Sequence, residues 1–353
     1  MRPYRKYVVD RVVQESESIR SVYLRPADGE PLRHFLPGQH LPIKVTIDGV
    51  PIYRCYTLSD SFKESHYRLT VKREAAQGNN VPRGRVSNYL HDELMVDDIV
   101  EAQAPTGEFF LDLNNDQPVA LIGAGIGITP MISMVNACIE TFTHREIYVV
   151  HAVRNSALHA FKEDLRHVAR EHENVHLFVL YSQPRLDDVS GRDFDQIGRL
   201  DLSILRRVLP HLDMQFFICG PDSMMAQLSG ELIAAGISAA QIHMEHFHVS
   251  KPPPTARKAA SGDATAREHD ILVEFRQSGK VLPWDAEAKS LLTFALANDV
   301  YISSGCEYGD CGTCLTPLLS GAVAYGHRTG IDPDPGSCLP CSCKPVTSIV
   351  LDA

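Results

Sequence analysis

The sequence has no apolar stretch that approaches the 18 or so residues needed to span a membrane. No apolar run follows Met1, and Arg2, Arg5 and Lys6 lead straight into a strand-like pattern. We therefore expect neither a signal peptide nor a membrane span. Positive charge is also scarce, because 34 lysine and arginine residues face 44 aspartate and glutamate residues, for a net charge of −10. This balance argues against a nucleic-acid partner.

The sequence also lacks the spread-out cysteines of a secreted disulfide framework. Of its nine cysteines, five lie between residues 306 and 341 and a sixth is Cys343. This pattern favours a reducing compartment, and we expect a cytoplasmic protein. The 353 residues have an ordinary globular composition and suffice for two or three domains.

The clustered cysteines predict an iron–sulfur site. Cys306, Cys311 and Cys314 follow the C-x4-C-x2-C spacing which, with a later fourth cysteine, is typical of plant-type [2Fe–2S] proteins. Three thiolates must converge from one tight loop, and the neighbouring glycines allow such a curl. Structural zinc is the alternative, but only one pair has the C-x2-C spacing of a zinc knuckle. The spacing leaves the fourth ligand open among Cys338, Cys341 and Cys343.

Residues 1 to about 110 contain six short β-rich runs that are separated by Gly and Pro clusters. Six strands with little helix predict a small barrel. The expected strands are Tyr4–Val13, Ile19–Arg25, His40–Ile47, Ile52–Ser59, Tyr67–Arg73 and Ile99–Ala104.

Residues 118–248 alternate apolar runs of strand length with helical patterns, which predicts a parallel, doubly wound sheet. The expected strands are Val119–Ile122, Ile147–His151, Val175–Tyr181 and Phe216–Cys219. The expected helices are Pro130–Glu140, Ala157–His172, Leu202–Leu209 and Asp222–Ala235.

A proline-rich segment, Lys251–Glu268, is predicted to be a linker. After it, strands are expected at Ile271–Arg276 and Gly279–Pro283, and a helix at Lys289–Asn298. Residues 269–353 carry ten acidic and five basic side chains, so this part could present an acidic docking face. We expect domains at residues 1–112 (a barrel), 113–248 (an α/β domain) and 269–353 (the iron–sulfur domain), with a linker at 249–268.

Two segments of the first domain carry side chains suited to a ligand that contains a phosphate and a flat ring. Arg54, Tyr56 and Thr57 could meet a phosphate, a flat ring and a ring nitrogen. Gly84 and Ser87 open an amphipathic helix whose N-terminus could bind a phosphate. The alternatives are ordinary packing for the strand residues and a surface helix capped by Ser87.

Two segments of the second domain are suited to a dinucleotide. Gly125 and Gly127 follow a buried strand and open a helix, so a ligand could lie against the backbone. The third glycine of the Rossmann pattern is missing, and a tight strand–helix turn is the alternative. Cys219 ends a later parallel strand, at the edge where open α/β sheets bind ligands; the alternative is a core cysteine.

Taken in order, these segments resemble the ferredoxin–NADP reductase superfamily over residues 1–248. The resemblance implies that Arg54, Tyr56, Thr57, Val71, Lys72, Gly84, Val86 and Ser87 bind the flavin. It implies that Gly125, Gly127, Thr129, Pro130, Cys219, Gly220 and Pro221 bind the nicotinamide, and that Glu245 and Phe247 lie in the segment that closes over both. Thr57 and Cys219 are then the expected catalytic residues.

Three short sequence segments, at residues 71–73, 87–92 and 105–109, are similar to segments in the reductase domain of flavohaemoglobins. That similarity implies FAD, with FMN as the alternative. Residues 269–353 resemble plant-type ferredoxins, which implies an α+β, β-grasp-like fold. In that family the last ligand follows a Gly-x-x-Leu-x-Cys pattern, which Gly336, Leu339 and Cys341 match. Cys341 is therefore the expected fourth ligand and Cys343 the alternative.

The order of a reductase followed by a ferredoxin resembles the reductase components of oxygenases. It implies that NAD(P)H reduces FAD, that the [2Fe–2S] cluster receives the electrons, and that a separate acceptor, an oxygenase component, takes them up. A free-standing diaphorase or stress reductase and a redox sensor are the alternatives.

We expect NADH rather than NADPH, because Tyr181–Arg185 contains one arginine and Arg154 is the only other candidate for a phosphate clamp. We also considered a metal site at His243, His246 and His248, but no cysteine or carboxylate pair completes it.

Overall fold

The computed structural model describes residues 4–63, 65–76, 84–142, 144–247, 271–302, 309, 312, 314–326, 329 and 333–353, apart from the side chain of Val50. These residues form two compact units. The larger unit contains residues 4–48 and 56–247, and the smaller one contains residues 49–55 and 271–353. No helix among these residues combines the length and apolar character needed to cross a membrane. The predicted linker Lys251–Glu268 lies outside the described residues.

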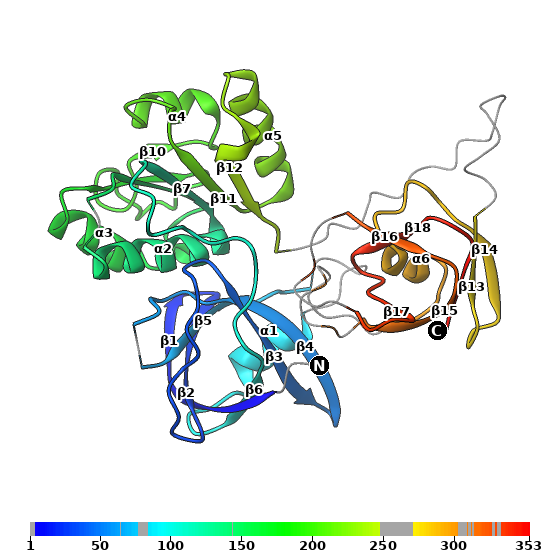
Figure 1. Cartoon of the computed structure of the whole chain (residues 1–353). Helices are drawn as coiled ribbons and strands as arrows, with labels where there is room; N and C mark the ends of the chain where they lie inside the picture. The colour runs from blue at the N-terminus through cyan, green and yellow to red at the C-terminus, as the bar shows by residue number, and fades with distance from the viewer. Residues whose placement is uncertain are drawn as a thin grey trace. The chain divides into compact units, whose positions relative to one another are not determined.

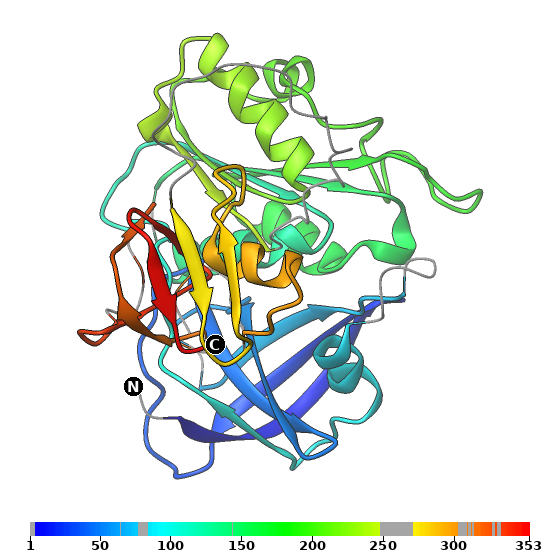
Figure 2. The same ribbon diagram turned by 90° about the vertical axis from the view of Figure 1, so that its right-hand side faces the viewer.

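The first part of the chain forms the predicted six-stranded sheet, in the order β4-β3-β6-β1-β2-β5 (Figures 1 and 2). Its pairs are antiparallel where the register is defined. A bridge between Leu58, just after β4, and Leu69 in β5 joins the two ends of the order, so the sheet closes into a barrel. The strands are β1 (Arg5–Ser16), β2 (Ile19–Pro26), β3 (His40–Ile47), β4 (Val50–Thr57), β5 (Tyr67–Lys72) and β6 (Ile99–Ala102), with helix α1 at Arg85–Asp92.

The second part forms a parallel sheet in the order β10-β9-β8-β7-β11-β12. The four predicted strands are confirmed, and two short edge strands, β10 and β12, join them. The strands are β7 (Val119–Ala124), β8 (Ile147–Val153), β9 (Val175–Tyr181), β10 (Gln196–Ile197), β11 (Gln215–Cys219) and β12 (Ile242–Glu245). The α-helices are α2 (Thr129–Glu140), α3 (Lys162–Glu171), α4 (Leu202–Val208) and α5 (Asp222–Ala234).

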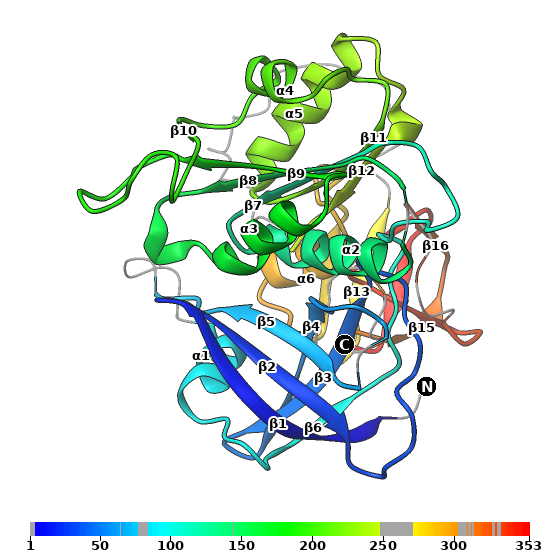
Figure 3. The same cartoon turned by 90° about the vertical axis from the view of Figure 1, so that its left-hand side faces the viewer.

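Alternation along β7 explains why helices cover both faces of this sheet (Figure 3). Val119 and Leu121 belong to the core beneath α2 and α3, whereas Ala120 and Ile122 belong to the core beneath α4 and α5. All four side chains are fully buried. A continuous apolar run therefore predicted a strand buried on both faces, and the doubly wound fold is confirmed.

The prediction of one long helix over Ala157–His172 is wrong. A short 3-10 turn, η2 (Ser156–Leu158), precedes α3, and the chain turns at Phe161, whose φ of 56° is left-handed. The Phe161 ring is buried in the core beneath α2 and α3. Packing of this ring thus accompanies a backbone conformation that a helix interior does not allow.

The smaller unit combines a five-stranded sheet, in the order β14-β13-β19-β15-β17, with a two-stranded sheet of β16 and β18 and one helix, α6 (Figure 2). Ser290 caps α6 by accepting a hydrogen bond from the Thr293 N–H at 3.2 Å. The α+β expectation is confirmed. The elements are β13 (Leu272–Phe275), β14 (Lys280–Pro283), α6 (Leu291–Ala297), β15 (Thr316–Ser320), β16 (Val323–Tyr325), β17 (Ser337–Cys338), β18 (Cys343–Pro345) and β19 (Ile349–Leu351).

Two glycines of the α/β domain predict opposite stability changes on substitution by alanine. A Cβ on Gly127 would lie 2.2 Å from the Cys219 carbonyl oxygen, whereas a Cβ on the exposed Gly230 of α5 meets nothing within 4 Å. We expect Gly127→Ala to lower the free energy of unfolding by about 1–3 kcal/mol. Gly230→Ala should raise it by roughly 0.5–1 kcal/mol. Urea unfolding followed by circular dichroism measures both, and equal midpoints for the two variants would contradict the packing described.

Candidate functional site

The strand order of the α/β sheet reverses between β7 and β11. From β7 the chain proceeds through β8 and β9 on one side, and it later returns to β11 and β12 on the other. Ligands of open α/β sheets bind outside the carboxyl ends of the strands at such a switch point. The register aligns Cys219 at the end of β11 with Gly123 on β7 and Glu245 on β12.

The predicted nicotinamide loop, residues 125–130, is in close contact with the end of β11. Gly125–Ile128 forms one 3-10 turn, and Gly125 has a left-handed φ of 55°. At Gly127 the backbone approaches the Cys219 carbonyl so closely that only glycine fits. Thr129 is buried and its Oγ1 donates to the Ile126 carbonyl at 3.0 Å, which fixes the turn at the start of α2. The structure thus brings together the loop at residues 125–130 and the segment at residues 219–221.

Cys219 is fully buried at this point. Burial, followed by the negative charge of Glu245, raises the pKa of its thiol well above the ordinary value. The side chain is therefore a neutral thiol at physiological pH, and it can pack against a ring but is a poor nucleophile. Phe247, two residues beyond Glu245, is 36% exposed and thus available to a ligand.

The sequence reasoning missed a histidine behind the nicotinamide loop. His151 on β8 is fully buried, and its Nε2 lies 3.3 Å from the Gly125 carbonyl oxygen. Burial lowers the pKa of His151 to about 4 and keeps the ring neutral. The available signal was a polar residue inside a buried strand run, Ile147–Val153.

On the barrel side, the end of β5 is tied to the start of α1. The Ser87 Oγ accepts from the Glu74 N–H and donates to the Gly84 carbonyl, both at 3.2 Å. His91 Nε2 lies 2.8 Å from the Val71 carbonyl oxygen. The predicted flavin residues Val71, Lys72, Gly84, Val86 and Ser87 therefore gather in one place.

The alternative interpretation of Ser87 as a helix cap is wrong. Gly84 is the N-cap residue and no side chain caps the helix. Ser87 instead lies inside the first turn and is 7% exposed. The N–H groups of the first turn and the Ser87 hydroxyl can donate hydrogen bonds to a phosphate, so the residues fit the predicted group.

The remaining predicted flavin residues lie on β4. Tyr56 and Thr57 immediately precede Leu58, which bridges to Leu69 of β5, so the end of β4 runs beside β5. Thr57 is 7% exposed. Arg54 is exposed, and its Nη1 donates to the Tyr53 carbonyl at 2.7 Å.

The cysteines of the smaller unit fit an iron–sulfur cluster. Cys314 and Cys341 are buried in its core with Sγ atoms 3.1 Å apart. A Cβ on Gly309 would lie 2.6 Å from Ser342 Oγ, so Gly309 approaches the side chain of the residue next to Cys341. The pKa of Cys343 is raised by hydrogen bonding with Cys338, by burial and by the nearby thiols of Cys341 and Cys314, so these four cysteines lie close together in one core. Cys306 and Cys311 lie outside the described residues.

Two of the histidines considered for a metal site have other partners. His243 Nε2 lies 2.9 Å from Gln215 Oε1 and its ring stacks on Phe217. His246 Nδ1 lies 2.8 Å from Asp222 Oδ1. His248 is outside the described residues.

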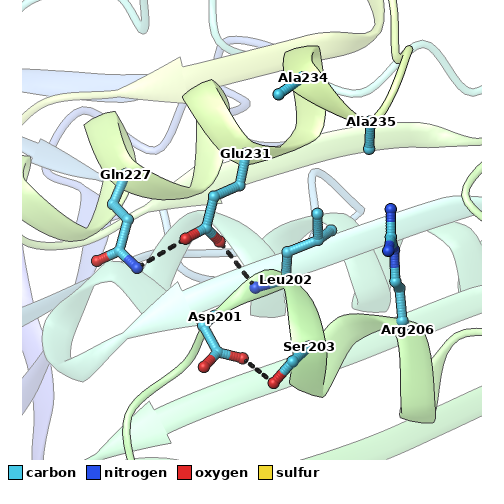
Figure 4. A pocket seen from close by; sticks show the side chains of 8 residues that line it. All are labelled: Asp201, Leu202, Ser203, Arg206, Gln227, Glu231, Ala234 and Ala235. Atoms are coloured by element: carbon cyan, nitrogen blue, oxygen red, sulfur yellow. Dashed lines mark hydrogen bonds between the residues drawn. The ribbon is translucent and has the colours of Figure 1, made fainter.

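A groove of about 390 Å³ lies elsewhere, between α4 and α5 (Figure 4). Its carboxylates already stabilise the helices: Glu231 Oε2 accepts from the Leu202 N–H at 2.9 Å, and Asp201 Oδ1 accepts from the Ile204 N–H at 2.9 Å. None of the predicted cofactor residues lines this groove. The residue positions rather than the hollow therefore identify the site.

Sequence-family models match all three parts of the chain. Residues 7–111 match an oxidoreductase FAD-binding domain, residues 121–229 an oxidoreductase NAD-binding domain and residues 273–346 a 2Fe-2S iron-sulfur cluster binding domain.

Some relatives match only the FAD- and NAD-binding parts of the chain, and one solved structure matches all three parts. A flavohemoprotein of Bacillus cereus is 38% identical over 246 residues, which is 69% of this chain and 61% of that protein. The flavohem-like FAD/NAD-binding domain of a Vibrio cholerae nitric oxide dioxygenase is 30% identical, with a TM-score of 0.62 over 69% of this chain and 98% of that one. Phthalate dioxygenase reductase shares the fold of the whole chain, at 23% identity and a TM-score of 0.59 over 99% of this chain and 98% of that one.

These matches confirm the predicted fold, the three cofactors and the oxidoreductase class. The chain spans about 61% of the length of the curated flavohemoproteins it matches, in the reductase region that the Vibrio domain also covers. FAD, a nicotinamide dinucleotide and a [2Fe–2S] cluster are its cofactors. The chain belongs to the ferredoxin–NADP reductase-like flavoproteins and carries a C-terminal [2Fe–2S] ferredoxin domain.

Proposed function

We propose that this protein is the reductase component of a multi-component oxygenase and passes electrons from NADH to a separate acceptor protein. The observation that carries the proposal is the cysteine-lined core of the smaller unit, on one chain with a flavin barrel and a nicotinamide sheet. Phthalate dioxygenase reductase, whose name states that role, has the same three-part fold. When bound, the nicotinamide, FAD and cluster supply hydride transfer and single-electron transfer.

The chain's own residues position these groups and exclude water. The Thr57 hydroxyl is proposed to donate a hydrogen bond to a flavin ring nitrogen. Arg54 and Tyr56 lie near it on the same strand, β4. Val71, Lys72, Gly84, Val86 and Ser87 are proposed to hold the rest of the flavin. The nicotinamide site is proposed to be formed by Gly125, Gly127, Thr129, Pro130, Gly220 and Pro221. Cys219 is proposed to pack against the nicotinamide ring, and Glu245 and Phe247 to lie in the segment that closes over it.

We propose Cys306, Cys311, Cys314 and Cys341 as the cluster ligands. The 3.1 Å separation of the Cys314 and Cys341 sulfurs supports the last of these. We also retain the domain boundaries near residues 112, 248 and 268. A cytoplasmic location is proposed because the cluster thiols must stay reduced until iron binds.

Turnover of the full chain with two artificial acceptors tests the proposed function. NADH should support rapid reduction of both ferricyanide and cytochrome c, and a purified oxygenase partner should accelerate NADH oxidation further. Absence of turnover with every acceptor would favour a redox sensor. Fast turnover with small quinones or dyes and none with any protein acceptor would favour a diaphorase.

The surroundings of Arg185 predict a preference for NADH. Its guanidinium pairs with Glu17 through contacts of 2.6 and 3.1 Å, and Asp187 and Asp188 follow it in the same loop. A 2′-phosphate would compete with these carboxylates. We expect kcat/KM for NADH to exceed kcat/KM for NADPH about tenfold or more. Glu17→Gln should reduce this ratio of the two kcat/KM values. A tenfold preference of the wild type for NADPH would show that the interpretation is wrong.

The cysteine geometry predicts which substitutions remove the cluster. Cys341→Ser should abolish or severely disturb the visible and EPR spectra of the cluster, because the sulfur 3.1 Å from that of Cys314 is lost. Cys338→Ser and Cys343→Ser should leave both spectra largely intact and serve as matched controls. Loss of the cluster in Cys343→Ser but not in Cys341→Ser would replace Cys341 by Cys343 in the ligand set.

A further inference from the structure

A partly buried polar junction connects the barrel to helix α2. It is formed by Asp60 and Ser61, just after β4, together with Ser133, Asn136 and Glu140 on α2. Both elements belong to the larger compact unit. The proposed flavin residue Thr57 lies three positions before Asp60, and the proposed nicotinamide residue Thr129 lies four positions before Ser133.

Asp60 provides the central contacts of this junction. Its Oδ1 accepts a hydrogen bond from Asn136 Nδ2 at 3.0 Å, and its backbone carbonyl accepts one from Ser133 Oγ at 2.8 Å. Ser61 Oγ donates to the Glu140 carboxylate, and Lys63 Nζ donates to the Glu140 carbonyl at 2.5 Å. These hydrogen bonds connect two turns of α2 to the short segment at residues 60–63.

The barrel side of the junction is itself rigidly held. Asp60 Oδ2 lies 3.4 Å from Arg68 Nε on β5, and the two side chains are only 14% and 7% exposed. Arg68 Nε also donates to the Ser59 carbonyl at 3.0 Å, and its guanidinium lies 4.8 Å over the Phe161 ring of the α/β domain. His66 Nε2 lies 3.7 Å from Asp60 Oδ2. Because these groups are charged and largely withdrawn from water, their geometry is costly to change.

The alternative is that these contacts only stabilise the fold. Ordinary stabilisation does not require polar groups on α2, where nearly every other residue is apolar and buried. Ser133, Asn136 and Glu140 are instead spaced three and four residues apart, so they share the helix face that meets Asp60 and Ser61. Directional hydrogen bonds fix distance and angle more tightly than apolar packing does.

We propose that Asp60, with Ser133 and Asn136, positions the nicotinamide-side helix relative to the flavin-side strand and so sets the approach of the two rings. This inference rests on the proposed function. The three are positioning residues, because they act through β4 and α2. A small error in the separation of reacting groups lowers the rate of the chemical step much more than it lowers binding.

The test removes the contacts between Asp60 and α2 by changing α2, so the Asp60–Arg68 pair within the barrel is preserved. In the full-length holoenzyme, Ser133→Ala/Asn136→Ala should slow flavin bleaching by NADH about 10- to 100-fold in stopped flow. KM for NADH and the flavin content should change less than about threefold. Asn136→Asp, which sets a second carboxylate against Asp60, should slow the step at least as much.

Asp193→Asn is the matched control. Asp193 is a more deeply buried carboxylate, 2% exposed, whose partners Lys162 and Arg192 all lie within the α/β domain. This variant should lose stability but keep the bleaching rate within about twofold. Equal slowing in Asp193→Asn and in the junction variants would mean that general destabilisation is responsible, which would overturn the proposal.

Amide hydrogen exchange provides a readout that is independent of activity. The junction variants should exchange faster across α2, Thr129–Glu140, and at normal rates across α5, Asp222–Ala234. Faster exchange in α2 with an unchanged bleaching rate would overturn the positioning role, as would unchanged exchange and rate together. Wild-type protein that NADH fails to bleach would instead contradict the proposed function.

Discussion

The close approach of Gly127 to the Cys219 carbonyl is the constraint on which the proposed nicotinamide site depends. It brings the loop after β7 against the end of β11 at the point where the strand order reverses. Without a side chain at residue 127, the turn at Gly125–Ile128 closes and α2 begins at Thr129. The position of α2 in turn places Ser133 and Asn136 opposite Asp60, so one backbone contact influences both the nicotinamide site and the junction with the barrel.

Much of the fold could be predicted from the sequence because its elements are locally consistent. Val119–Ile122 is buried on both faces and was recognisable as a buried strand, and the β-rich runs of the barrel were recognisable between their Gly and Pro clusters. The failures have specific causes. The left-handed Phe161 interrupts a pattern that is otherwise helical, and the edge strands β10 and β12 have only two and four residues. Such features depend on tertiary packing that a local pattern does not contain.

Part of the candidate site could be predicted from the sequence and part could not. The residues that the family resemblance assigns to the cofactors remain predictions from short motifs, and most of them lie at the end of β5 or at the switch point. His151 and Asp60 were missed because their partners are backbone carbonyls and side chains distant in sequence. One signal was available: polar residues at 133, 136 and 140 of a helix that is otherwise apolar and buried.

The central claim is that electrons from NADH reach the cluster of the smaller unit through the flavin of the larger one. Anaerobic mixing of the full chain with NADH, followed by visible absorbance and EPR, tests it directly. The account predicts that the cluster becomes reduced in flavin-loaded protein and stays oxidised in protein stripped of flavin. A cluster that remains oxidised in flavin-loaded protein, although NADH bleaches the flavin, would contradict it.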